Sequence, residues 1–163
     1  MLPSAEIGGA AERAIVGLVS ALATVLSVLF HYEVMSITSA RLPAVRLRRR
    51  ARIVALMLAL MAAHMVEVWI FAGAFWVLSH WPSTGVLVGP SDGGVFDCVY
   101  FSVTAFTTVG FGDLVPRGPI RILSGTEAIA GLGLITWSAS LAFLEMQRDW
   151  REYRIVGRRG QRR

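Results

Sequence analysis

The sequence predicts an all-α integral membrane protein with three transmembrane helices and a shorter, re-entrant helix that leads into a loop. The first observation is composition: the 163 residues are 55% hydrophobic and only 17% charged, whereas about a quarter is charged in soluble domains. The second is that the charges are clustered, which leaves three long apolar tracts. The third is that each tract exceeds the roughly 20 residues that cross a bilayer.

The first tract, 14–38, is predicted to form an additional N-terminal transmembrane helix. The second tract, 53–79, and the third, 120–147, are predicted to cross the membrane as well. Between these two, 95–107 is apolar with interspersed Ser and Thr and is too short to cross, so we expect either a re-entrant or a buried helix there. The prolines and glycines of 80–94 predict a loop before this helix.

The basic residues predict the orientation of the chain. All sixteen are Arg, six within 41–52 and seven within 148–163. Because basic residues concentrate in cytoplasmic segments, we expect the N-terminus outside and 148–163 as a basic cytoplasmic tail. Both blocks flank apolar spans, so we expect no nucleic acid as a partner. The partners expected are the lipid bilayer and its anionic lipids, at the Arg-rich loop and the tail.

Arg46, Arg49 and Arg52 recur at every third position, a spacing also found in voltage sensors. The block is short, is interrupted by further arginines and follows Pro43. We therefore interpret it as a solvated loop and predict no voltage sensor that moves charge across the membrane.

The segment after the re-entrant helix, 108–113, carries the most specific pattern. Gly110 and Gly112 alternate with Val109 and Phe111. Backbone that is neither helix nor barrel is tolerated at membrane depth only where it is buried or lines water. Glycine permits left-handed backbone angles, so this alternation can direct successive carbonyl oxygens to one side. The segment is therefore predicted to line a narrow pore, and the prolines of 114–119 predict a turn after it.

The run Thr108-Val109-Gly110-Phe111-Gly112 resembles the filter sequence of the potassium-channel pore-domain family, with Phe111 in place of the more usual Tyr. The resemblance covers about 96–146, and the second span fits the outer helix of that family. It implies a pore domain over 53–147, with an outer helix at 53–79, a pore helix at 95–107, a filter at 108–113 and an inner helix at 120–147.

This resemblance implies passive K⁺ conduction through a carbonyl-lined filter. One filter per chain implies a homotetramer around the pore. K⁺ is expected as the permeant ion at Thr108, Val109, Gly110 and Phe111, with no cofactor and no enzymatic activity. The expected location is the bacterial inner membrane.

Three alternatives belong to other functions. A weakly selective cation channel is disfavoured by the intact Gly-Phe-Gly run. A potassium transporter of the filter-loop type carries four such loops in one long chain, and this sequence has one. An intramembrane metalloenzyme would need the histidines and glutamates of the first two spans to hold a metal ion with an open position.

Several residues are expected to support the filter. The bacterial two-helix members of the family carry a Glu four residues before the second filter Thr, paired with the Asp after the filter. Here that position is Thr104, so Asp113 needs another partner, for which Tyr100 is a candidate. Thr107 precedes the filter directly. Glu127 is expected either to form a hydrogen bond behind the filter or to face the outer vestibule.

The inner helix carries candidates for gating and for the cavity wall. Gly131 and Gly133 lie mid-way along it, where family members often bend at a glycine, although close helix packing also favours small residues. Gly133, Thr136 and Ser140 share one helical face, which is expected either to line a hydrated cavity or to pack against a neighbouring helix.

Four ionisable residues lie inside the first two spans: His31 and Glu33 in the first, and His64 and Glu67 in the second. Ionisable residues within a membrane usually face the protein interior or water. We therefore expect a polar cluster that docks the first span onto the second. Two further interpretations are a proton sensor, because imidazole titrates near neutral pH, and a bound divalent metal ion, because His and carboxylate suit zinc.

Overall fold

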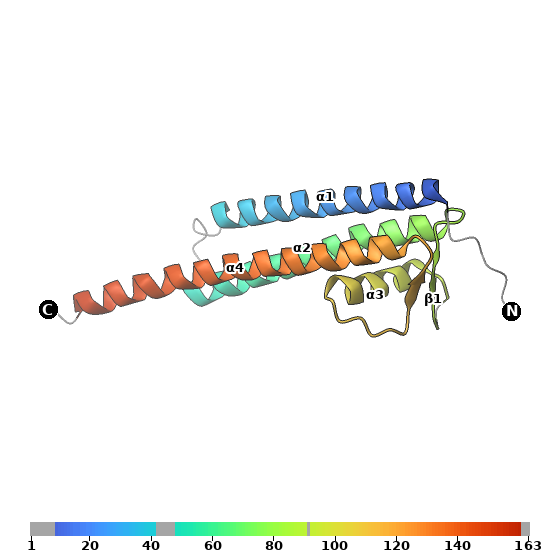
Figure 1. Cartoon of the computed structure of the whole chain (residues 1–163). Helices are drawn as coiled ribbons and strands as arrows, with labels where there is room; N and C mark the ends of the chain where they lie inside the picture. Colours follow the sequence, from blue (N-terminus) through green and yellow to red (C-terminus); the bar gives the residue numbers. More distant parts are fainter. Residues whose placement is uncertain (1–8, 42–47, 91, 161–163) are drawn as a thin grey trace.

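The computed structural model describes residues 9–41, 48–90 and 92–160. Their elements are four helices and two short strands, in the order α1 (Ala10–Arg41), α2 (Arg49–Ser79), β1 (Val86–Val88), α3 (Val95–Phe106), β2 (Val115–Arg117) and α4 (Arg121–Gly160). The three long helices run alongside one another, and α3 and both strands gather at one end (Figure 1). Three stretches are long and apolar enough to cross a membrane: Ala10–Arg41, Arg50–Ser79 and Arg121–Arg148. The predicted all-α fold with three spans is confirmed.

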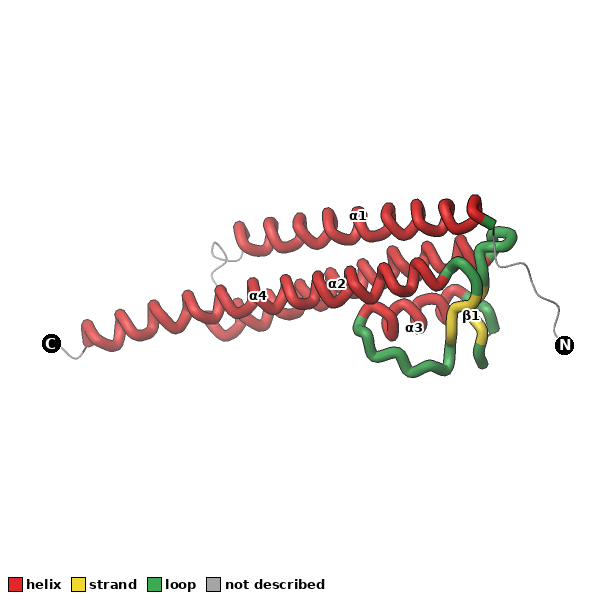
Figure 2. Tube along the Cα trace, in the orientation of Figure 1, coloured by secondary structure: helices red, strands yellow, loops and turns green. Residues whose placement is uncertain are grey.

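The extra helix α1 packs along both α2 and α4, as the tube trace shows (Figure 2). Its buried face is a single stripe of mostly small or polar residues: Val16, Ser20, Ala23, Ser27, His31 and Met35. Small side chains let helix backbones approach closely. Such close packing matters in a membrane, because lipid is as apolar as the protein and no hydrophobic driving force brings the helices together. The opposite face exposes large apolar side chains such as Leu18, which is 72% exposed, as expected of a surface in lipid.

The predicted limits of all three spans were wrong because the helices continue past the apolar tracts. α1 covers Ala10–Arg41 rather than 14–38. α2 begins at Arg49, so the Arg block is helical from there on and is no loop, whereas Arg46 lies outside the described residues. α4 continues to Gly160, so most of the predicted basic tail extends the inner helix. Arg is a good helix former, and Pro is absent from α4, so nothing in the sequence ends either helix at the membrane edge.

The segments around α3 were predicted as loop and turn, but the structure pairs part of them. β1 and β2 form an antiparallel ribbon in which Val88 pairs with Val115 and Val86 with Arg117. Gly85 lies so close to this ribbon that an added Cβ would come within 2.2 Å of the Arg117 carbonyl oxygen. The ribbon fastens the chain before α3 to the chain that follows residues 107–113, and so holds both ends of the segment between the strands.

Candidate functional site

The pore loop, residues 107–113, begins directly at the end of α3. The start of α3 is held by a capping contact in which the Gly94 N–H donates to the Asp97 carboxylate at 3.1 Å. At its end, the Thr108 N–H donates to the Ala105 carbonyl at 3.0 Å and the Gly110 N–H donates to the Thr104 carbonyl at 3.1 Å. The loop therefore turns back onto the helix that precedes it and shares that helix's last carbonyl groups.

Backbone angles alternate along the pore loop. Thr108, Gly110 and Gly112 have φ values of 59°, 53° and 81°, whereas Val109 and Phe111 between them are not in the positive region. The two glycines were expected to allow this. A positive φ at Thr108 was not expected, because a β-branched residue at positive φ is an outlier. Such a conformation costs about 1–3 kcal/mol and persists only where the surrounding structure imposes it.

The outer end of the pore loop is held by Tyr100 and Asp113. The Tyr100 hydroxyl donates to the Asp113 carboxylate at 2.8 Å, and the Tyr100 ring stacks on Phe111 with centroids 6.5 Å apart. The hydrogen bond from Tyr100 lowers the pKa of Asp113. Thr104 does not take the place of the family's Glu, because its hydroxyl donates to the Phe101 carbonyl at 2.8 Å. It contributes through its backbone carbonyl instead.

Behind α3, a buried polar chain joins three helices. Glu127 of α4 is fully buried and contacts the Ser102 hydroxyl of α3, and Ser102 also lies 2.8 Å from the Val68 carbonyl of α2. Of the two placements considered for Glu127, the structure shows the one behind the pore loop. No pattern in the sequence indicated Ser102. Thr107 is exposed, and its hydroxyl donates to the Val103 carbonyl at 2.7 Å.

The two glycines of the inner helix have different surroundings. An added Cβ at Gly131 would lie 2.1 Å from the Phe106 carbonyl oxygen, so α4 crosses the end of the pore helix closely at this point. Gly133 has open space around it within the chain. Thr136 and Ser140 are exposed, and their hydroxyls donate to carbonyls one turn earlier in α4. Among the residues that the structure describes, the face with Gly133, Thr136 and Ser140 is therefore exposed on the single chain.

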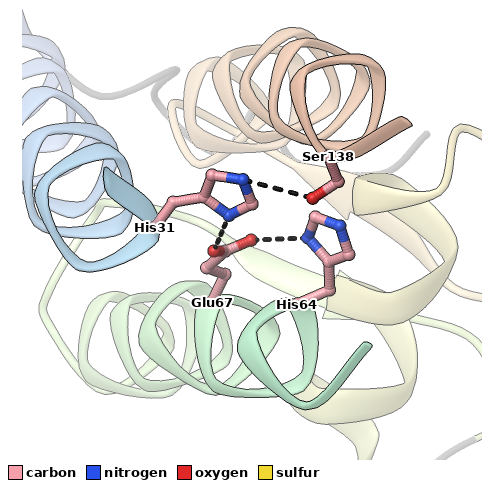
Figure 3. Close-up of polar contacts among 4 residues, drawn as sticks. All are labelled: His31, His64, Glu67 and Ser138. Carbon is pink, nitrogen blue, oxygen red and sulfur yellow. Dashed lines mark hydrogen bonds and ion pairs between the residues drawn. The ribbon is translucent and has the colours of Figure 1, made fainter. Parts of the chain in front are cut away.

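Farther from the pore loop, three of the four ionisable residues predicted inside the first two spans meet at the junction of α1, α2 and α4 (Figure 3). Glu67 lies between two imidazoles, with its carboxylate oxygens 2.7 Å from His31 Nδ1 and 2.8 Å from His64 Nδ1. Ser138 of α4 lies 3.2 Å from His31 Nε2. The expected contact between the first two spans is thus present, whereas Glu33 is exposed and lies outside the cluster. Ser138 is a further member of the cluster that no sequence pattern indicated.

A membrane protein whose last two spans frame a short helix and a glycine-containing loop belongs to the pore-loop class. The model of an ion channel family matches residues 63–148, more than half of the chain. The chain belongs to this family and is an ion channel of the membrane. Comparisons with curated proteins and with solved structures gave no match.

Proposed function

We propose that the protein conducts K⁺ selectively and passively as a homotetramer, with residues 108–112 as the filter. The alternating φ values along the pore loop carry this proposal. A backbone that alternates in this way can turn successive carbonyl oxygens to one side, where they replace the hydration shell of a cation. K⁺ would bind at the carbonyls of Thr108, Val109, Gly110 and Phe111.

The exposure of the pore loop supports an assembly of several subunits. Val109 and Phe111 are 57% and 71% exposed in the single chain, although both are large apolar residues at membrane depth. Four copies around an axis would cover these side chains and bring four filters together. The negative end of the α3 dipole also points into the loop, which favours a cation there. The exposed face with Gly133, Thr136 and Ser140 would then line the inner cavity.

The arrangement of the helix ends supports the predicted orientation. The end of α1, the start of α2 and the last turns of α4 lie toward one side of the molecule, opposite the pore loop (Figure 1). The described parts of both Arg blocks therefore lie toward one side, which fits the positive-inside rule for a cytoplasmic face. The pore loop and the start of α1 would face outward, in a plasma membrane of bacterial type.

Replacing Gly110 by Ala tests the role of the filter backbone. Gly110 has a φ of 53°, and left-handed angles cost other residues about 1–2 kcal/mol. We expect Gly110→Ala, measured in planar bilayers, to lose selective K⁺ conduction. Gly17→Ala is the matched control, because Gly17 lies in α1 with open space around it. A Gly110→Ala protein with unchanged selectivity would contradict the proposed filter.

A further inference from the structure

The cluster of His31, His64 and Glu67 has the composition and position of a metal site. One donor atom from each of the three side chains lies within 4.8 Å of those of the other two. His31 and Glu67 are fully buried, and the His64 side chain is 19% exposed. We propose that this cluster binds a divalent transition-metal ion of the zinc type, one in each subunit. The inference stands apart from the proposed function, because it concerns a site away from the filter.

The ligand types favour zinc over calcium or magnesium. Two imidazoles and one carboxylate are a known zinc set that leaves a fourth position open, whereas calcium and magnesium prefer oxygen ligands. His64 and Glu67 are three residues apart on α2, and His31 faces them from α1. Helical bundles build metal sites in this way, from a pair at i and i+3 on one helix and ligands on facing helices.

The charge and packing of the cluster also favour a bound cation. A buried carboxylate within a membrane is costly unless it is paired. The two imidazole rings are stacked, with centroids 5.2 Å apart and planes at 21°, so two protonated rings would repel each other. Neutral rings can instead coordinate a metal ion, and the carboxylate then compensates part of its charge. The rings of Trp137 and Phe106 complete the apolar surroundings, with centroids 5.6 Å from His31 and 5.7 Å from His64.

Ser138 occupies the place of an outer partner that orients a ligand. Thr126, Thr136 and Ser140 on the same helix donate to the carbonyl four residues earlier. The Ser138 hydroxyl instead lies 3.2 Å from His31 Nε2. Metal-bound histidines usually donate their other ring N–H to such an acceptor, which fixes the tautomer. His31 would therefore bind the ion through Nδ1 and donate from Nε2 to Ser138.

The uncovered side of the cluster leaves room for a fourth ligand. His64 borders a cavity of about 320 Å³ that also touches Phe106 and Thr107, at the junction of pore helix and pore loop. Sites with three protein ligands keep such an open position for water or another small ligand.

The metal content of the purified protein tests the proposal. The full-length protein is stripped with a chelator, reloaded with zinc, passed through gel filtration and analysed by mass spectrometry for metal. We expect one zinc per subunit in the wild type, and its loss in His31→Gln, His64→Gln and Glu67→Gln. Glu33→Gln and His80→Gln are matched controls, because both residues are ionisable but lie outside the cluster, and they should keep the zinc.

Cobalt binding gives a second measurement. It is made on the wild type, so it does not depend on whether the cluster variants fold. Cobalt-loaded wild type should show the intense visible absorption of a four-coordinate ion with nitrogen ligands, and added zinc should remove it. Ser138→Ala should weaken zinc binding by about 10-fold or more, as expected for the loss of an outer partner. Wild type that retains no zinc and shows no cobalt band would overturn the proposal. Cluster variants that keep as much zinc as Glu33→Gln would overturn it as well.

Discussion

Tyr100 and Asp113 link the outer end of the pore loop to the helix that precedes it. Their hydrogen bond of 2.8 Å joins residues thirteen positions apart, and the Tyr100 ring also stacks on Phe111. A charged acceptor strengthens such a bond relative to a neutral one. The contact can therefore restrain a loop that is otherwise exposed.

We expect Tyr100→Phe to raise the pKa of Asp113 toward its ordinary value of 3.8, because the hydrogen bond from Tyr100 is what lowers it. The contact stabilises the loop fully at pH values above the ordinary pKa of Asp113. This stabilisation is lost as the pH falls through the lowered pKa. Carboxyl carbon shifts of ¹³C-labelled aspartates report this pKa, with Asp113→Asn to assign the signal. An equal pKa in wild type and Tyr100→Phe would show that the bond does not form in the membrane.

Among individual residues, the sequence predicted part of the candidate site. The glycine alternation located the pore loop, and the departure at Thr104 led to Tyr100 as the partner of Asp113. The positive φ of Thr108 was not predictable, because it runs against the preference of a β-branched residue. Ser102 and Ser138 were missed because a serine in an apolar helix becomes significant only through residues on other helices.

At the scale of elements, the inner helix depends on a close crossing with the pore helix. Gly131 sits at that crossing, against the Phe106 carbonyl, and Glu127 makes a polar contact with Ser102 of α3 one turn earlier. Gly131 is therefore required by packing. Gly133, with open space around it, stays a candidate for a bend in α4.

We expect Gly131→Ala to destabilise the assembled protein by about 1–3 kcal/mol, the usual cost of overpacking. The added methyl group would lie 2.1 Å from the Phe106 carbonyl oxygen, so one of the two helices must move. Thermal unfolding in detergent, monitored by size-exclusion chromatography, measures the effect. Gly133→Ala is the matched control on the same helix and should be milder. The opposite order would show that neighbouring subunits crowd Gly133 more than the pore helix crowds Gly131.

Hydropathy predicted the three spans but not where their helices end. Hydropathy indicates where the chain leaves the apolar part of the membrane. A helix can continue past that point when helix-forming residues such as Arg follow, so α2 and α4 extend into Arg-rich segments. The pairing of β1 with β2 was missed for another reason. Each strand has three residues, and the partner lies beyond the whole of α3, so no local pattern indicates it.

At the scale of the whole molecule, the pore loop and the Arg-rich segments occupy opposite ends of the helix bundle. α1 adds a third span outside the two-helix pore module and is fixed to it through the stripe of small residues and the contact of His31 with Glu67. With three candidate spans among the described residues, we expect the two termini on opposite sides of the membrane.

Cysteine labelling tests this orientation. In a Cys98→Ser background, we expect Ser4→Cys to react with a membrane-impermeant reagent added to intact cells. Gly160→Cys should react only after the membrane is opened, because the Arg-rich segments belong to the cytoplasmic side. Labelling of both positions in intact cells, or of neither, would contradict the three-span topology.

The central claim is selectivity for K⁺ through the filter at residues 108–112, and the reversal potential under bi-ionic conditions tests it most directly. Purified wild-type protein in a planar bilayer would face K⁺ on one side and Na⁺ at equal concentration on the other. A carbonyl-lined filter that replaces the hydration shell of K⁺ predicts a reversal potential displaced far toward the K⁺ equilibrium potential, and block by barium. A reversal potential near zero would contradict the claim and would instead indicate a weakly selective cation channel.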